Sequence, residues 1–225
     1  MKFVAGAVLM VALAACGNEK TGPSPVVSAI GAMAKGSVAK VKARKSGGKT
    51  GGKAVSAEER RAALEEAGKP ILRVSSKTLG QTGFLTISDN KDDVLTWKTP
   101  DGVTFSQRNG VLIQTRGLGA DLMSAQAPSV AQLMRAGEGY QRIYYFLGDD
   151  DQGTRRTYDC TTTIVGKESI EVLGRTHNAT HVTEICERPL GKLTNDYWVE
   201  GSSIRKSRQW VSGAIGYIDF ERVID

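Results

Sequence analysis

Short runs in which hydrophobic and polar residues alternate follow one another from residue 71 to residue 220. Alternation with a period of two places one side of each run in a core and the other toward solvent, which is typical of β-strands. Val, Ile, Thr and aromatic residues, which favour strands, fill many of these runs. The pattern predicts strands over residues 71–74, 83–87, 94–99, 103–107, 111–115, 141–147, 154–165, 169–173, 176–186, 196–200, 204–211 and 215–220.

Turn-forming residues separate these runs at hairpin spacing. Asn109-Gly110 predicts a two-residue hairpin, and further turns are expected at 148–153 and 166–167. Two segments favour helix: Ser56 can cap a short helix starting at residue 57, and residues 121–136 predict two helical pieces separated at Pro128. Many short strands with one or two short helices indicate an all-β, antiparallel body.

The first 16 residues have the layout of a lipoprotein signal peptide. A positive start is followed by the apolar run 3–15, and small residues lead directly to Cys16. The run is shorter than the roughly 20 apolar residues that span a bilayer. The ending resembles a bacterial lipobox, in which cleavage after residue 15 leaves Cys16 as the lipid-bearing first residue. An ordinary signal peptide with a chance cysteine is the alternative.

Residues 16–56 are expected to form a flexible, basic, Gly/Lys-rich tether. From residue 17 to 56 the chain has eight basic residues, one acidic residue and no aromatic side chain, so this segment buries too little apolar surface to fold. Residues 57–225 carry 21 basic and 23 acidic residues, so the positive charge belongs to the tether. Nucleic-acid binding requires a basic face on the domain itself, and we expect none. An anionic lipid or glycan is a simpler partner for the basic tether than nucleic acid. The alternative is that the basic residues are a chance enrichment in a solvated linker.

Cys160 and Cys186 remain once Cys16 is assigned to a lipid. Two cysteines in an exported protein pair more often than not. This pair would close a loop of about 27 residues, worth about 3.5 kcal/mol in the loop-entropy account. We therefore expect a Cys160–Cys186 disulfide, with two buried free thiols as the alternative.

Patterns typical of catalysis or metal binding are weak in this sequence. It contains no GxSxG, Walker or HExxH motif. His177, His181 and Glu184 have a spacing that suits zinc on a helix, but the strand-like residues around them separate i and i+4 by about 13 Å. Gly117 to Gly119 can either bind an anion or simply turn the chain. Asp149 to Asp151 fit a solvated hairpin tip. We expect no catalytic residue, metal site or cofactor.

Aromatic and arginine side chains are the remaining candidates for ligand binding. Flat aromatic rings can stack on sugars, and arginines can pair with their acidic groups. A surface holding Arg116, Trp198 and Trp210 is the predicted ligand site. The alternative is that all three tryptophans, Trp97 included, fill the core.

Several strings within residues 57–225 resemble the YjbF/GfcB family of group 4 capsule lipoproteins. The most specific are Thr115 to Leu122, Asn195-Asp196-Tyr197-Trp198 and Ser207-Arg208-Gln209-Trp210-Val211, supported by 97–102, 108–114, 158–160 and 184–186. The resemblance implies a large antiparallel meander curled into a barrel-like sandwich, and an outer-membrane lipoprotein from an exopolysaccharide or capsule export locus. It brings no established enzymatic activity. Gly17, where an aspartate would retain a lipoprotein at the inner membrane, favours the outer membrane, with the body facing the periplasm.

The expected organisation is therefore a signal peptide (1–15), a lipidated tether (16–56) and a YjbF-like β domain (57–225). The expected function is a non-enzymatic accessory in exopolysaccharide or capsule assembly or export, which contacts the polysaccharide or other export proteins. Two alternatives remain open. One is a periplasmic carbohydrate-active hydrolase, which requires two carboxylates about 5–10 Å apart in a groove. The other is an envelope scaffold that binds only proteins.

Overall fold

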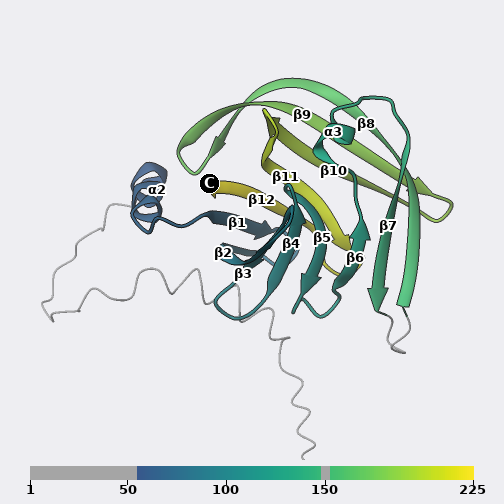
Figure 1. The fold of residues 1–225 in the computed structure, drawn as a ribbon, viewed down its shortest axis with the longest axis horizontal. Helices are drawn as coiled ribbons and strands as arrows, with labels where there is room; N and C mark the ends of the chain where they lie inside the picture. The colour runs from purple at the N-terminus through teal and green to yellow at the C-terminus, as the bar shows by residue number, and fades with distance from the viewer. Residues whose placement is uncertain (1–54, 148–152) are drawn as a thin grey trace, which may run out of the picture.

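The computed structural model describes residues 55–147 and 153–225, which form one antiparallel sheet of twelve strands (Figure 1). The strand order is β5-β4-β3-β2-β1-β12-β11-β10-β9-β8-β7-β6, so all sequential strands except β5 and β6 pair, and β1 joins β12. This confirms the predicted all-β meander. The strands are β1 (Ile71–Ser76), β2 (Gln81–Lys91), β3 (Val94–Lys98), β4 (Thr104–Arg108), β5 (Val111–Arg116), β6 (Leu122–Gln126), β7 (Tyr140–Leu147), β8 (Gly153–Val172), β9 (Arg175–Arg188), β10 (Gly191–Glu200), β11 (Ser203–Ser212) and β12 (Gly216–Ile224).

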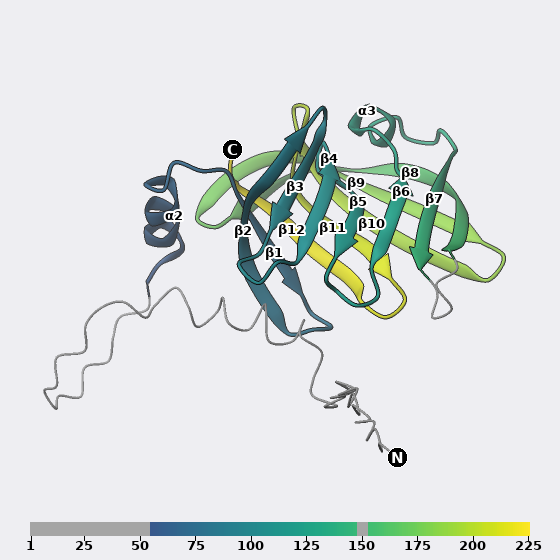
Figure 2. The same ribbon diagram turned by 60° about the horizontal axis from the view of Figure 1, so that its bottom comes forward.

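The sheet curls until its edge strands, β5 and β6, lie side by side and the barrel is nearly closed (Figure 2). Side chains of β5 bridge this seam. Gln114 donates its amide to the carbonyl of Met123 at 3.1 Å. Arg116 donates to the carbonyls of Leu122 and Met123, each at 3.2 Å. These bonds satisfy backbone acceptors that would otherwise form an open sheet edge, so the expected barrel-like closure is confirmed.

Inward-facing side chains fill the barrel, as strand alternation requires. Along β10 every second residue from Leu193 to Val199 is buried, and the residues between them are half-buried. Aromatic rings gather around Tyr144, whose ring centroid lies 5.2 Å from that of Trp210 and 5.7 Å from that of Tyr158. Trp97 is fully buried in the same core.

The predicted helix over 121–136 is wrong in its first half, where Leu122–Gln126 form strand β6. This segment pairs antiparallel with β7, and side chains of β5 bind its carbonyls from the other edge. This tertiary pairing overrides its weak helical preference. Asp121 closes the preceding turn, since its carboxylate accepts the amides of Gly117 and Leu118 at 2.9 and 3.2 Å. The second half does form a helix, α3 (Val130–Leu133), capped by Ser129.

The predicted turn at 166–167 is also wrong, because β8 continues to Val172. Gly166 lies instead at a β-bulge opposite His181, where glycine absorbs the irregular backbone. The turn comes at Leu173-Gly174, where both residues have positive φ. We call residues 166–179 the arm; it extends past the end of β10, whose pairing with β9 stops at Thr180.

The helix α2 (Ala57–Glu65) fixes the tip of the arm. Ser56 caps it in the predicted capping box. Arg61, almost fully buried, donates to the carbonyls of Val172, Leu173 and Val223 at 2.7, 3.0 and 2.7 Å. The arm is thereby joined to both α2 and the end of β12.

The expected signal peptide, Cys16, the tether up to residue 54 and the acidic turn at 149–151 lie outside the described residues. Within residues 55–147 and 153–225, neither helix has the length and apolar character needed to cross a membrane.

Candidate functional site

A cluster of buried polar side chains lies inside the barrel. Arg142 projects inward from β7, Glu184 from β9, Asn195 and Tyr197 from β10 and Gln209 from β11, and all five are fully buried. The burial pattern of each strand places these residues at inward-facing positions. We call these five residues, together with Tyr140, the buried polar cluster.

Glu184 is the centre of this cluster. Its carboxylate forms an ion pair with Arg142 at 2.7 Å, and both side chains are fully shielded from solvent. Tyr140 donates to the other carboxylate oxygen at 2.7 Å, while Asn195 and Tyr197 donate at 2.6 and 3.1 Å. A buried charge is tolerated only when it is paired and hydrogen-bonded, and Glu184 meets both conditions.

The cluster also ties β11 to β5 across the barrel interior. The Gln209 carbonyl oxygen accepts the backbone amide of Leu112 at 2.8 Å, and its amide donates to the carbonyl of Gly110 and the hydroxyl of Ser207, both at 2.9 Å. Arg142 adds a bond to the carbonyl of Leu112 at 3.3 Å. The cluster is therefore a cross-brace between strands that are far apart in the sheet order.

The tyrosines of this interior are held in their protonated form. Burial raises the pKa of Tyr140, and the negative charge of Glu184 raises it further. Burial likewise raises the pKa of Tyr144 and Tyr197, and the nearby Arg142 only partly offsets this. Tyr140 and Tyr197 therefore donate to Glu184 as fixed hydrogen-bond donors at physiological pH and do not act as acids or bases.

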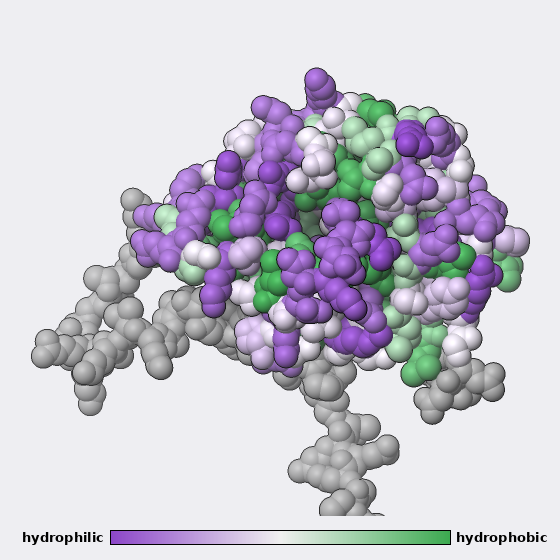
Figure 3. Space-filling view, in the orientation of Figure 1, coloured by the Kyte–Doolittle hydropathy of each residue, from purple (hydrophilic) through white to green (hydrophobic). Residues whose placement is uncertain are grey.

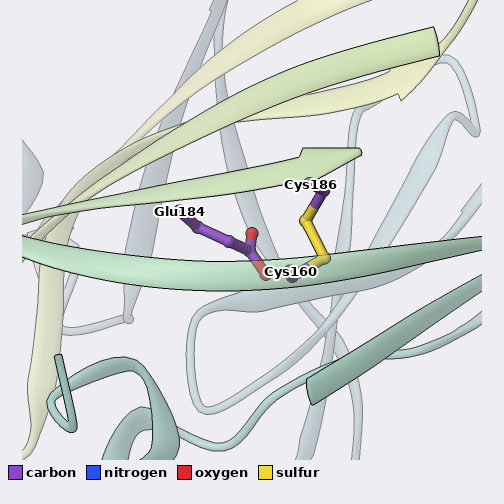
Figure 4. A group of neighbouring side chains, drawn as sticks. All are labelled: Cys160, Glu184 and Cys186. Carbon is purple, nitrogen blue, oxygen red and sulfur yellow. A yellow bond between two sulfur atoms is a disulfide. The ribbon is translucent and has the colours of Figure 1, made fainter. Parts of the chain in front are cut away.

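The disulfide Cys160–Cys186 borders the buried polar cluster (Figure 4). The two cysteines are direct cross-strand partners on β8 and β9, with an S–S distance of 2.02 Å. The sulfurs and a carboxylate oxygen of Glu184 lie within 4.8 Å of one another, close enough for a metal site. The sulfurs are bonded to each other, and the carboxylate is occupied by Arg142 and its other donors, so this group is structural.

The structure places the predicted ligand residues in three different environments. Arg116 bridges the β5–β6 seam. Trp210 is half-buried against the aromatic core. Trp198, on the outer side of β10, stacks on His181 at 4.5 Å and donates its indole N–H to Glu168 at 2.7 Å. Among the described residues, no hydrogen bond or ring contact joins any two of these three side chains, so the structure does not bring them together.

The two histidines and Glu184 also remain apart, because the segment is a strand, as predicted. His177 contacts Glu200 at 3.0 Å, whereas His181 contacts Glu168 at 2.8 Å and Asp196 at 3.1 Å.

Sequence reasoning missed the buried polar cluster. A signal for it was present: in the alternating segment Val182 to Cys186, Glu184 shares the face of two apolar residues. A carboxylate on a core face requires a cation and donors from other strands. Which residues supply them depends on strand order, and Arg142 stands 42 positions away.

Comparisons with known proteins agree with this fold. The sequence model of the family described as "Group 4 capsule polysaccharide lipoprotein gfcB, YjbF" matches residues 52–223. Among solved structures, the hypothetical lipoprotein YmcC from Escherichia coli (K12) is similar, with a TM-score of 0.62 and 17% identity, over 81% of this chain and 98% of that one. At this identity the likeness concerns the fold alone. No curated protein matches the chain significantly.

Proposed function

Because the chain belongs to the group 4 capsule polysaccharide lipoprotein family, we propose that it is a non-enzymatic accessory in exopolysaccharide or capsule assembly or export. A lipid on Cys16 anchors it at the outer membrane, and residues 16–56 tether a barrel that faces the periplasm. The single observation that carries the proposal is the family match over residues 52–223. The proposed membrane anchor rests on the same match, because the family is described as one of lipoproteins.

The architecture suits a body that holds its shape outside the cytoplasm. A disulfide joins β8 to β9, which fits an oxidising compartment. The buried polar cluster braces β11 against β5, and side chains close the barrel seam. Such a body supports binding and positioning, in which its surface meets a glycan or an export protein.

The hydrolase alternative finds little support in the two carboxylates of one surface hollow. Asp93 and Asp225 border one hollow at an end of the barrel. Burial alone would raise the pKa of Asp225, but hydrogen bonds and charge from Arg205, together with Arg222, outweigh it and lower the pKa. A general acid for glycoside cleavage needs a raised pKa. Asp93 is paired with Arg108 at 3.1 Å.

Complementation of a deletion strain tests the proposal. Wild-type protein and the control Asn18→Ala should restore extracellular polysaccharide and fractionate with the outer membrane. Cys16→Ala should be found away from the membrane and should restore little polysaccharide. A deletion strain with unchanged polysaccharide would refute the role in assembly or export. Full restoration by unanchored Cys16→Ala would refute the requirement for the lipid.

The non-enzymatic part of the proposal has its own test. Asp93→Asn and Asp225→Asn each remove one carboxylate of this hollow, and both variants should restore polysaccharide of unchanged amount and chain length. Loss of processing in either variant, with folding retained, would favour the hydrolase.

A further inference from the structure

One end of the barrel carries the hollow that Asp93 and Asp225 border. We call it the mouth groove; its volume is about 230 Å³. Three hairpin tips, β2–β3, β4–β5 and β10–β11, surround it together with the end of β12. Its lining comprises Leu72, Asp93, Leu95, Gln107, Asn109, Gly110, Ser202, Ser203, Ile204, Arg205, Ser207, Phe220, Arg222 and Asp225.

The floor of the mouth groove is apolar and its rim is polar. Leu72 and Phe220 belong to the main core, and Leu95 packs against it. Exposed or half-buried polar groups, among them Asn109 and Ser203, stand around this floor. The space-filling view shows the middle of the face hollowed, with hydrophobic surface between hydrophilic groups (Figure 3). An apolar floor with a few polar groups is the usual layout of a small-molecule site.

Arg222 is the charged group in the groove with unused hydrogen-bonding capacity. Its guanidinium lies over the ring of Trp97, 4.9 Å from the centroid, and its side chain is 25% exposed. The nearest carboxylate oxygen, on Asp225, is 3.6 Å away, beyond hydrogen-bond distance. Its buried Nε has no hydrogen-bond partner among the described residues.

The neighbouring carboxylates of Asp225 and Asp93 are bound to other arginines and do not hydrogen-bond to Arg222. Asp225 is committed to Arg205, which donates to both of its carboxylate oxygens at 2.7 and 2.8 Å. Asp93 is paired with Arg108. Burial lowers the pKa of Arg222, and the positive charge of Arg205 adds to this effect against the attraction of Asp225. A further anion beside Arg222 would be attracted by the guanidinium groups of Arg222 and Arg205 and repelled by the single carboxylate of Asp225.

The size of the groove limits the ligand. A volume of about 230 Å³ lies below the roughly 300–1,000 Å³ typical of sites for drug-sized ligands. It suits one sugar ring at a time and not a long oligosaccharide. The apolar floor offers a surface for the C–H face of such a ring, and the rim offers partners for hydroxyl groups.

We propose that the mouth groove binds one acidic sugar residue of a polysaccharide, with the sugar carboxylate paired to Arg222 and the ring lying against the half-buried Leu95, above the buried Leu72 and Phe220. The choice of a sugar rests on the proposed function, whereas the carboxylate contact rests on the geometry around Arg222. An arginine fork matches a carboxylate with two parallel hydrogen bonds.

Binding of glucuronate and of glucose to the full-length protein in detergent tests the proposal. Calorimetry or ligand-observed NMR should give a glucuronate affinity about tenfold or more above that of glucose, because one or two charge-assisted bonds are at stake. Arg222→Gln should remove this preference. Arg155→Gln, at an exposed arginine of β8, is the matched control and should keep it.

A second variant guards against misfolding, because Arg222 also packs on Trp97. Ser203→Trp places bulk at the rim from an exposed position and should block glucuronate while the thermal unfolding transition stays unchanged. Equal affinities for glucose and glucuronate, or full binding by folded Arg222→Gln, would overturn the proposal. Binding of an acidic peptide but not of glucuronate would overturn it in favour of a protein partner.

The outcome separates this inference from the proposed function. If the wild type restores polysaccharide in the deletion strain and Arg222→Gln does so equally, the mouth groove proposal fails while the accessory role stands. If the deletion has no effect on polysaccharide, the role fails irrespective of what the groove binds in vitro.

Discussion

Substituting Arg142 by methionine should be among the most destabilising single changes in the described residues. The side chain is fully buried, and its Nη1 lies 2.7 Å from the carboxylate of Glu184. Methionine preserves much of the volume but leaves a buried carboxylate with only the neutral donors Tyr140, Asn195 and Tyr197. Removing one partner of a buried ion pair costs about 3–5 kcal/mol. For a domain of this size, about 4 kcal/mol corresponds to a fall in Tm of about 8–16 °C.

A double-mutant cycle in urea, followed by tryptophan fluorescence with the disulfide intact, measures this effect. Glu184→Gln alone should also destabilise, because it leaves the charge of Arg142 unpaired. Arg142→Met with Glu184→Gln should cost at least about 2 kcal/mol less than the sum of the single variants, since contacting residues couple strongly. The control Arg155→Met should change the free energy of unfolding by no more than about 0.5 kcal/mol. A loss below about 1 kcal/mol for Arg142→Met, or strictly additive costs, would refute this account of the cluster.

Three further predictions concern the disulfide, the arm and Trp198. Cys160→Ala with Cys186→Ala should lower the free energy of unfolding by about 3 kcal/mol, as expected for their separation of 26 residues; urea curves that coincide with the wild type would contradict this. Gly174→Ala should release α2 and speed its hydrogen exchange, because Gly174 has φ +77° and an added Cβ would lie 2.9 Å from the backbone nitrogen of Glu58. Gly213→Ala is the control, because an added Cβ there meets open space, and it should leave the hydrogen exchange of α2 unchanged. Equal exchange rates of α2 in both variants would disprove the contact between Gly174 and Glu58. The pKa of Glu168 is lowered mainly by the hydrogen bond from Trp198 and next by that from His181. These bonds therefore stabilise the folded protein above the ordinary glutamate pKa of about 4.3, and their contribution is lost as pH falls through the lowered pKa. Trp198→Phe should raise that pKa in a carboxyl NMR titration, and the difference in stability from the wild type should vanish in acid; an unmoved titration would exclude the indole as the cause.

Local pattern was sufficient to predict most of the strands. Asn109 and Gly110 both have positive φ, as the predicted hairpin between β4 and β5 requires. The capping box at Ser56 is likewise a local device, readable from two residues. Where the predicted helix failed, distant contacts decided the structure: residues 122–126 are a strand because they pair with β7, and side chains of β5 bind their carbonyls from the other edge.

The interior cluster illustrates the other limit of sequence reasoning. Strand alternation can show that Glu184 faces inward, but only the strand order reveals that β7 and β10 supply its partners. The same holds for Arg222, whose environment joins β12 to the ring of Trp97 on β3. Conversely, the Cys160–Cys186 pairing could be proposed from cysteine count alone, since only two candidates remained after Cys16.

The intact mass of the protein purified from its native membrane, measured without reductant, tests the central claim most directly. The account predicts a chain that begins at Cys16, carries the added mass of lipid, and has lost two hydrogens to the Cys160–Cys186 bond. A species that retains residues 1–15, with no lipid and three thiols open to alkylation, would contradict the anchor, the compartment and the proposed role together.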